Sequence, residues 1–432
     1  MIFNPKAETA PRAEIERFQL EKLKHAAVYA YEKVPRYHAK FDTAKFDPYK
    51  IKTLGDIKYM PFTDKTDFRD TYPYGMLAVP TSKIARFHAS SGTTGKPTVV
   101  GYTHNDIGLW AECVARIASA AGVGASDIVQ ISFGYGLFTG ALGLHYGMEK
   151  IGAAVIPVSS GNTEKQIMLL SDLKATALVS TPSYAVHIGE TAKSLGIDIT
   201  KDFALKYGVL GSEGCTAEMR ERAEHALNIF ITDNYGMSEL MGPGVSGECE
   251  LRQGLHFNED YFLPEIINPE TLETLPEGAK GELIVTCLGR EALPLLRYRT
   301  RDITSLDYTP CECGRTTVRM AKASGRTDDM LKIRGVNVFP TAIESVIMGT
   351  AGTAPHYEII ADRKSDSDTL EVKIEVADGD LLDSYSKLEK LRADIRHNLK
   401  SIIGLDVKVS LVEPKSITRY EGKAKRVFDL RK

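Results

Sequence analysis

The 432-residue sequence has no long apolar run, no excess of charge of either sign and no dense set of cysteines. No stretch approaches the length of a membrane span, and the first residues lack the apolar core of a signal peptide. A net charge of −3 gives no sign of a polyanionic partner, so we expect no nucleic acid. Six scattered cysteines do not suggest a disulfide scaffold. These absences predict a soluble, cytoplasmic, globular protein.

Short apolar strands alternate with helices over residues 104–233. This alternation predicts a largely parallel sheet covered by helices, in which ligands bind beyond the carboxyl ends of strands. Three segments then become candidate binding loops: residues 211–213, residues 234–239 and the loop after Ser132. We expect strands at 127–132, 153–158, 177–180, 207–210 and 228–233, and helices at 13–33, 65–72, 104–121, 163–173, 183–195 and 216–227.

The pattern changes twice in the second half of the chain. Residues 243–324 suggest an antiparallel β-rich region, and the polar segment 325–329 suits a linker. Beyond it we expect a strand at 330–333, a helix from Pro340, a hairpin at 364–368, a helix with a stripe from Tyr385 to Ile402, and a strand at 407–412. The predicted fold is α/β. A large N-terminal domain (1–327), with helix-covered mixed or parallel sheets, is joined by a hinge to a small α+β domain (328–432).

One stretch, residues 90–97, has the composition of a phosphate-binding loop. Its glycines let backbone N–H groups approach an anion, its hydroxyls donate, and its lysine adds positive charge. It is not a Walker A loop, since Ser90 stands in place of the first glycine and Pro97 in place of the Ser/Thr. The flanks, 84–88 and 98–102, predict strands, so the loop would join two strands. From composition alone, a flexible surface turn is an equal alternative.

Five short motifs occur in an order that a known family shares: Ser91–Pro97, Tyr235–Glu239, Tyr298–Asp302, Gly325–Asp329 and Glu421–Lys423. Together they resemble the motif set of the adenylate-forming acyl- and aryl-CoA synthetases over nearly the whole chain. Finer features resemble the phenylacetate–CoA ligase branch, namely residues 133–140, 254–260 and 334–340. The resemblance implies two steps. A carboxylate attacks the α-phosphorus of ATP, giving an acyl-adenylate and pyrophosphate, and the thiol of CoA then takes the acyl group and releases AMP.

The resemblance also implies an ATP site. The Ser/Thr/Gly loop would hold the β- and γ-phosphates and stabilise the charge on departing pyrophosphate. Tyr235 would stack on adenine, with an ordinary core aromatic as the alternative. Residues 211–213 would form the adenine-side loop, which is a strand-to-helix turn in either case. The implied nucleotide-binding residues are Ser90, Ser91, Gly92, Thr93, Thr94, Gly95, Lys96, Gly211, Ser212, Glu213, Asn234, Tyr235, Gly236, Met237, Ser238, Asp302 and Arg326.

Two carboxylates have implied roles and competing interpretations. Glu239 matches the Mg²⁺-linked glutamate of the family, because a hard cation that bridges phosphate oxygens prefers a carboxylate. The alternative is a surface glutamate at a helix start. Asp302 matches the aspartate that accepts both ribose hydroxyls. The alternative is an ion-pair partner for Arg299 or Arg301.

The last third of the chain carries further implied roles. Arg326 would reach a phosphate or the ribose. Asp328 matches the hinge about which the C-terminal domain rotates between the half-reactions. Lys423 resembles the catalytic adenylation lysine, whose ammonium would stabilise charge near the α-phosphate. Lys425 is an alternative for that role, and a plain charge in a basic tail is an alternative for both.

Aromatic side chains after the strand at 127–132 resemble the acid-binding side of the family site. Phe133, Tyr135 and Phe138 would line the substrate pocket, because aromatic walls suit an aromatic acid. Core packing against the sheet is an equal alternative for each ring.

Four scattered residues suggest a second metal site. Cys311 and Cys313 lie one residue apart in a turn, and Cys249 and His256 flank a predicted hairpin. Together they make a Cys₃His set, the donor set of structural zinc. The alternative is reduced surface thiols beside a core histidine. The remaining cysteines, at positions 113, 215 and 287, are predicted to be small core residues.

We therefore predict an ATP-dependent aryl-acid–CoA ligase of aromatic-acid catabolism, acting on phenylacetate or a close relative. It would use ATP, Mg²⁺, CoA and structural Zn²⁺, and the resemblance suggests a homodimer. The nearest rival passes the acyl group to a carrier protein or an amine. A non-catalytic nucleotide-binding relative is the rival of a different class, and a P-loop kinase is disfavoured by Pro97.

Overall fold

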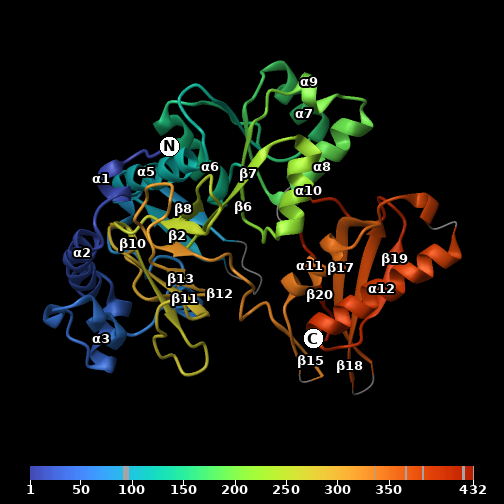
Figure 1. The fold of residues 1–432 in the computed structure, drawn as a ribbon. Coiled ribbons are helices and arrows are strands. Elements are labelled where there is room, and N and C mark those ends of the chain that lie inside the picture. The colour runs from blue at the N-terminus through green and yellow to red at the C-terminus, as the bar shows by residue number, and fades with distance from the viewer. Residues whose placement is uncertain (91–96, 335, 365–366, 382–383, 421–423, 432) are drawn as a thin grey trace. The chain divides into compact units, whose positions relative to one another are not determined.

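The computed structural model describes residues 1–90, 97–334, 336–364, 367–381, 384–420 and 424–431. The chain forms two compact units (Figure 1). Unit 1 comprises Met1–Ser180, Thr200–Ser212 and Phe230–Ala323; unit 2 comprises Thr181–Ile199, Glu213–Ile229 and Ser324–Lys432. The predicted α/β class is confirmed, with a large sheet domain and a small C-terminal α+β domain. The division at residues 327 and 328 stays a prediction.

A nine-stranded mixed sheet is the centre of unit 1. Its strand order is β13-β14-β9-β8-β7-β6-β5-β3-β4. The strands β3 to β7 pair in parallel, as predicted, and β8, β9, β13 and β14 continue the same sheet in antiparallel pairing. Part of the region expected as β-rich therefore extends the central sheet. The strands are β3 (Ile128–Ile131), β4 (Ala154–Ile156), β5 (Ala177–Ser180), β6 (Tyr207–Gly211), β7 (Phe230–Met237), β8 (Gly242–Glu248), β9 (Leu255–Phe257), β13 (Leu306–Asp307) and β14 (Arg319–Met320).

Two smaller antiparallel sheets complete the strands of unit 1. β1 (Arg86–Ala89) pairs with β2 (Val99–Tyr102), and Ala89 lies opposite Val99. The prediction that the phosphate-binding stretch joins two strands is confirmed. Its residues Ser91, Gly92, Thr93, Thr94, Gly95 and Lys96 lie outside the described residues. The second sheet contains β10 (Phe262–Ile267), β11 (Gly281–Cys287) and β12 (Tyr298–Thr304).

Helix α5 packs closely on α6 and on strand β8. It begins with a capping box formed by Thr103 and Asp106, which satisfies the first backbone N–H groups. A Cβ on Gly143 of α6 would lie 2.1 Å from the ring of Trp110, so this approach requires glycine. The larger helices of unit 1 are α2 (Arg12–Lys33), α3 (Pro35–Ala44), α5 (His104–Ala120), α6 (Gly140–Ile151) and α7 (Thr163–Asp172), and the short ones are α1 (Pro5–Glu8) and α4 (Lys65–Asp70). In α9 (Ile199–Asp202), Ile199 is assigned to unit 2 and the other residues to unit 1.

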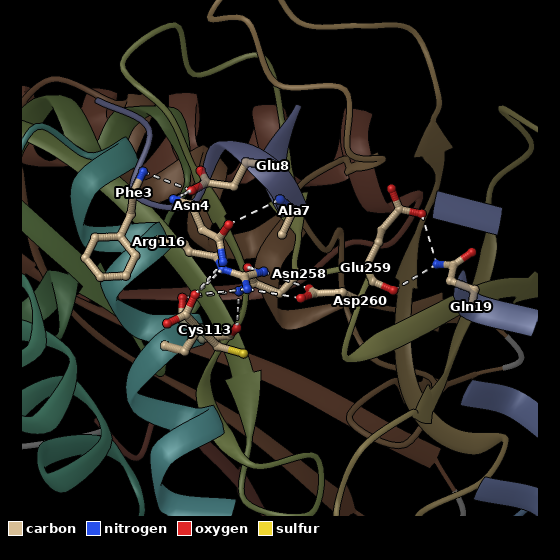
Figure 2. A network of polar contacts seen from close by, with 12 residues as sticks. Phe3, Asn4, Ala7, Glu8, Gln19, Cys113, Arg116, Asn258, Glu259 and Asp260 are labelled. Carbon is tan, nitrogen blue, oxygen red and sulfur yellow. Dashed lines mark hydrogen bonds and ion pairs between the residues drawn. The ribbon is translucent and has the colours of Figure 1, made fainter. Parts of the chain in front are cut away.

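A buried polar network ties helices α2 and α5 to the segment between β9 and β10 (Figure 2). Arg116 of α5 donates to both carboxylate oxygens of Asp260, at 2.7 and 3.0 Å, and also to Glu112. Gln19 of α2 donates to the backbone and side chain of Glu259. Buried charges are tolerated when they are paired and hydrogen-bonded, as here. Glu259 and Asp260, which belong to the family-like stretch 254–260, therefore hold helices α2 and α5 in place.

Unit 2 is built on a four-stranded sheet of order β19-β18-β17-β20. The predicted hairpin is confirmed by the pairing of β17 with β18. The predicted stripe on α12 is partly wrong, because Ile402 is 59% exposed and Ile403 is buried instead. The elements are α8 (Pro182–Ser194), α10 (Ala217–Leu227), β15 (Leu331–Ile333), β16 (Val336–Val338), α11 (Pro340–Gly349), β17 (Thr353–Lys364), β18 (Ser367–Val376), α12 (Tyr385–Ile403), β19 (Lys408–Val412) and β20 (Val427–Asp429). Across the described ranges, no helix is both long and apolar enough to cross a membrane.

Candidate active site and metal centre

Glu239 lies in the tight turn between β7 and β8. β7 extends to Met237, four residues beyond the predicted end, because β8 returns alongside it and pairs Met237 with Gly242. Residues 234–237 are therefore part of the strand, and the expectation that they follow it is wrong. Glu239 is 4% exposed, so the alternative of a surface glutamate at a helix start is wrong as well.

The backbone of this turn is held by side chains from other elements. Among the described residues, side chains donate hydrogen bonds to the backbone carbonyls of four residues of this turn and the start of β8. Sequence reasoning missed all of these donors, because each comes from a distant part of the chain. Tyr102 donates to Ser238 (3.4 Å), Arg290 to Glu239 (2.6 Å), Cys287 to Leu240 (3.5 Å) and Trp110 to Pro243 (2.7 Å). The turn is thus fixed from several sides at once.

Asp302 of β12 meets Tyr235 of β7. The phenol donates to Oδ2 of Asp302 at 2.6 Å, and Asp302 is 6% exposed. Arg299 instead pairs with Glu282 at 2.6 Å, and Arg301 lies 3.8 Å from the same carboxylate. The two arginines are therefore committed to another acid, which disfavours the interpretation of Asp302 as their partner. Tyr235 is only half-buried, unlike an ordinary core aromatic.

The predicted adenine-side loop begins where β6 ends beside β7. Gly211 pairs with Asn234, and the Asn234 amide donates to the carbonyl of Leu210 at 2.7 Å. A Cβ on Gly211 would lie 2.7 Å from the carbonyl oxygen of Asn234, so the approach needs glycine. Ser212 follows in a left-handed conformation, with φ of 72°. Gly211, Ser212 and Asn234 are thus brought together within unit 1.

Within unit 2, Glu213 contacts the chain beside the predicted catalytic lysine. Its carboxylate accepts hydrogen bonds from Ser183 Oγ at 2.8 Å and from the backbone N–H of Ala424 at 2.7 Å. Lys423 itself lies outside the described residues. The ammonium of Lys425 lies 4.9 Å from the ring centroid of Phe428.

The predicted linker residues form an ion pair with each other in unit 2. Arg326 Nε donates to Asp328 Oδ1 at 2.9 Å, and a second bond of 3.0 Å makes the pair bidentate. Nothing in this geometry tests a hinge, so that role of Asp328 stays a prediction.

The three predicted pocket aromatics differ in their surroundings. Phe133 is buried in the core, which fits the packing alternative. The hydroxyl of Tyr135 lies 3.1 Å from Nδ1 of His145. Burial raises the pKa of the Tyr135 hydroxyl. Phe138 is 44% exposed, so core packing does not account for it. Their role in substrate binding stays a prediction.

The four predicted zinc ligands come together in unit 1. One ligand atom from each of Cys249, His256, Cys311 and Cys313 lies within 4.8 Å of all the others. The sulfurs of Cys249 and Cys311 are 3.9 Å apart, and that of Cys313 is 3.5 Å from Nε2 of His256. Tetrahedral zinc, with bonds of about 2.3 Å to sulfur and 2.0 Å to nitrogen, separates its ligand atoms by about 3.5–3.8 Å. The residues present therefore fit zinc.

The surroundings of these ligands suit a metal too. Thr317 Oγ1 lies 3.3 Å from Nδ1 of His256, which leaves Nε2 on the side of the thiols. Arg315 donates to the Cys313 sulfur at 3.6 Å and to Glu8 at 2.7 Å. The pKa of Cys313 lies below its ordinary value, chiefly because Cys249 donates a hydrogen bond to its sulfur.

The comparisons with known proteins agree with these motifs. A family model described as "AMP-binding enzyme" matches residues 13–287, and one described as "AMP-binding enzyme C-terminal domain" matches residues 335–431. A phenylacetate-coenzyme A ligase from Thermus thermophilus is 46% identical over the full length of both chains. Another, from Escherichia coli, is 47% identical and covers 100% of this chain and 99% of its own. The chain belongs to the phenylacetate–coenzyme A ligase family.

Solved structures extend this likeness within the AMP-binding enzymes. A 2-hydroxyisobutyryl-CoA ligase in the postadenylation state, in complex with 2-HIB-AMP, is 30% identical with a TM-score of 0.93. The match covers 100% of this chain and 92% of the chain of that enzyme. The same enzyme with 2-HIB-AMP and CoA, in the thioesterification state, has a TM-score of 0.74 at 30% identity, over 99% of this chain and 92% of the other. This chain therefore shares its fold with a CoA ligase that was solved in complex with 2-HIB-AMP.

Proposed function

We propose that this protein is an ATP-dependent aryl-acid–CoA ligase that converts a phenylacetate-like acid, ATP and CoA to the aryl-acyl-CoA, AMP and pyrophosphate. The proposal is supported most directly by the pairing of Asp302 with Tyr235 on β7, the strand that leads into the turn of Glu239, in a chain matched over its full length by phenylacetate-coenzyme A ligases.

The residues of unit 1 would divide the work of nucleotide binding. Asp302 would accept the ribose hydroxyls, and the hydrogen bond from Tyr235 would fix the orientation of its carboxylate. Glu239 would hold Mg²⁺, which supplies positive charge on the phosphate oxygens. The loop 90–96 would bind the departing pyrophosphate through N–H and O–H donors.

Lys423, Arg326 and Asp328 would have the remaining roles that the resemblance implies. Lys423 would stabilise the charge that develops as the carboxylate attacks the α-phosphorus. Arg326 would contact the ribose or a phosphate, and Asp328 would serve as the hinge between the two half-reactions.

The metal centre would have a structural role. We infer that Cys249, His256, Cys311 and Cys313 hold Zn²⁺, because their ligand atoms lie close together. Four protein ligands close a tetrahedral site and leave no position for substrate, so the role of the metal would be structural. Cys249 follows β8, His256 lies within β9, and Cys311 and Cys313 lie in the segment between β13 and β14. Zinc would therefore hold the antiparallel end of the central sheet together. A homodimer stays a prediction.

A scan of acids tests this function. Pyrophosphate release is measured with phenylacetate, benzoates, indole acids and short fatty acids, each with and without CoA. We expect the highest kcat/KM with phenylacetate or a close aryl relative. If only short fatty acids released pyrophosphate, the proposal of an aryl-acid substrate would be rejected and the proposal of an adenylate-forming ligase would stand. If no acid released pyrophosphate, the whole proposed function would be rejected.

A further inference from the structure

Arg290 is a buried cation in the segment between β11 and β12. Its side chain is 4% exposed. Nη1 donates to the backbone carbonyl of Glu239 at 2.6 Å, and Nη2 donates to the carbonyl of Gly101 at 3.2 Å. The guanidinium also lies 5.0 Å from the ring centroid of Tyr102. One side chain thus joins the turn that carries Glu239 to β2, the strand that follows the Ser/Thr/Gly loop.

The charge of Arg290 is not explained by stability. In the described part of the chain, no carboxylate forms an ion pair with it, and its Nε has no hydrogen-bond partner. Other buried arginines of unit 1 have such partners, as Arg297 has in Glu265 at 2.9 Å. A buried cation that contacts two neutral carbonyls, the Tyr102 ring and the Cys287 thiol, with no carboxylate partner among the described residues, is costly to a fold. An apolar side chain would cost less, so the contacts of Arg290 point to a role in the site.

The backbone that presents Arg290 is itself anchored. Asp106 accepts hydrogen bonds from the N–H groups of Glu291, at 2.8 Å, and Ala292, at 3.0 Å. The side chain of Glu291 in turn accepts from Thr103 Oγ1 at 2.8 Å. Both groups belong to the capping box that begins α5. The guanidinium is therefore held from a rigid helix terminus, which is the arrangement that precise positioning requires.

We propose that Arg290 is a positioning residue that fixes the turn of Glu239, and with it a bound Mg²⁺, relative to strand β2. The proposal rests on the proposed function, in which Glu239 holds the Mg²⁺ of Mg·ATP. Because Arg290 holds both the Glu239 carbonyl and the Gly101 carbonyl of β2, its loss would let the metal ligand shift relative to β2. Groups that orient a metal ligand in this way typically change metal affinity or activity by about 10–100-fold.

The test compares Arg290→Met and Arg290→Lys with the wild-type protein. Calorimetry measures ATP binding with Mg²⁺ and with EDTA, which needs no acid substrate, and pyrophosphate release is followed as Mg²⁺ is varied. In Arg290→Met we expect Mg·ATP binding and half-saturation by Mg²⁺ to weaken by about 10–100-fold. Metal-free ATP binding changes by a clearly smaller factor, and KM for the acid is unchanged. Arg290→Lys keeps the charge and can reach one carbonyl, so it gives an intermediate shift.

Arg297→Met is the matched control, because Arg297 is equally buried and donates to Glu265 and to the carbonyls of Lys58 and Met60. It should lower the melting temperature and leave the Mg²⁺ dependence unchanged. An equal weakening of ATP with and without Mg²⁺, or the same Mg²⁺ shift in Arg297→Met, overturns the proposal. If Arg290→Met does not fold, an unshifted Mg²⁺ dependence in Arg290→Lys overturns it. If the wild-type protein binds Mg·ATP but turns over no acid, the proposed function is rejected. The role of Arg290 is then decided by the calorimetric binding measurements alone.

Discussion

The hydroxyl of Tyr235 donates to Oδ2 of Asp302 at 2.6 Å, and this bond joins two different sheets. Tyr235 belongs to β7 of the nine-stranded sheet and Asp302 to β12 of the three-stranded sheet. A hydrogen bond to a charged group contributes about 1.5–3 kcal/mol. The contact fixes one oxygen of the carboxylate that we propose binds the ribose.

Tyr235→Phe tests that contact. The ring remains for stacking on adenine, but Asp302 loses the donor that orients it. We expect KM for ATP to rise about tenfold, which corresponds to about 1.4 kcal/mol, with KM for the acid unchanged. Tyr31→Phe is the matched control, since it removes the tyrosine–aspartate bond between Tyr31 and Asp42, which joins α2 to α3. An unchanged KM for ATP in Tyr235→Phe would argue against Asp302 as the ribose ligand.

Gly236→Ala tests the packing that forms the Glu239 turn. A Cβ at Gly236 would lie 1.9 Å from the carbonyl oxygen of Gly242, a backbone atom that cannot give way without moving β8. We expect the free energy of unfolding in urea to fall by about 1–3 kcal/mol or more, and pyrophosphate release to be lost. Gly108→Ala in α5 meets no atom within 4 Å and should keep both properties. Full activity in Gly236→Ala would mean that the geometry of this turn is not critical.

Cys311→Ser tests the zinc centre. We expect purified wild-type protein to contain about one zinc per chain, and the variant to lose the metal and melt at a lower temperature. Cys113→Ala changes a buried thiol outside the cluster and should keep its zinc. Zinc-free wild-type protein, or unchanged stability in Cys311→Ser, would reject the centre.

Metal removal gives a second readout of the same centre. Arg315, which donates to Cys313, also binds the carboxylate of Glu8, and that carboxylate accepts from the N–H groups of Phe3 and Asn4. A chelator should therefore speed hydrogen exchange at residues 3 and 4 far more than in β3. Equal exchange with and without chelator would show that the metal does not order this segment.

The pH dependence of stability tests the network around Arg116. Burial alone would raise the pKa of Glu112, but the hydrogen bond from Asn4 and the charge of Arg116 outweigh it and lower the pKa. The stabilisation from Glu112 is therefore fully present above its unfolded pKa of about 4.3 and is lost as the pH falls through the folded pKa. In urea unfolding between pH 7 and pH 3, Glu112→Gln should lose less stability than wild type. The exposed Glu14→Gln should follow wild type, and identical curves for Glu112→Gln would contradict the assignment.

Much of the fold could be predicted because its signals are local. The 104–120 helix begins at a capping box, and strands β3 to β7 each follow a helical segment or a turn. The end of β7 could not be placed, because its last four residues carry a motif rather than an apolar run, and only the return of β8 makes them a strand. β20 was missed for the same reason, since the residues of β17 with which it pairs lie 68 positions earlier in the chain, as Ile359 does from Val427.

The candidate site divides in the same way. The set Cys249, His256, Cys311 and Cys313 could be predicted, because three thiols and one imidazole are a typical ligand set for zinc. The contact between Tyr235 and Asp302 was not predicted, although both residues were named, since it depends on two sheets meeting. Arg290 had no signal in the sequence at all, because a buried arginine that binds backbone carbonyls looks like any other charged residue.

The release of AMP with phenylacetate as the acid, measured with and without CoA, tests the central claim most directly. The account predicts that wild-type protein releases AMP and forms phenylacetyl-CoA rapidly when ATP, Mg²⁺, phenylacetate and CoA are all present, and that Glu239→Gln loses most of this activity. Formation of an acyl-adenylate that CoA does not discharge would show that another acceptor takes the acyl group, and would contradict the account.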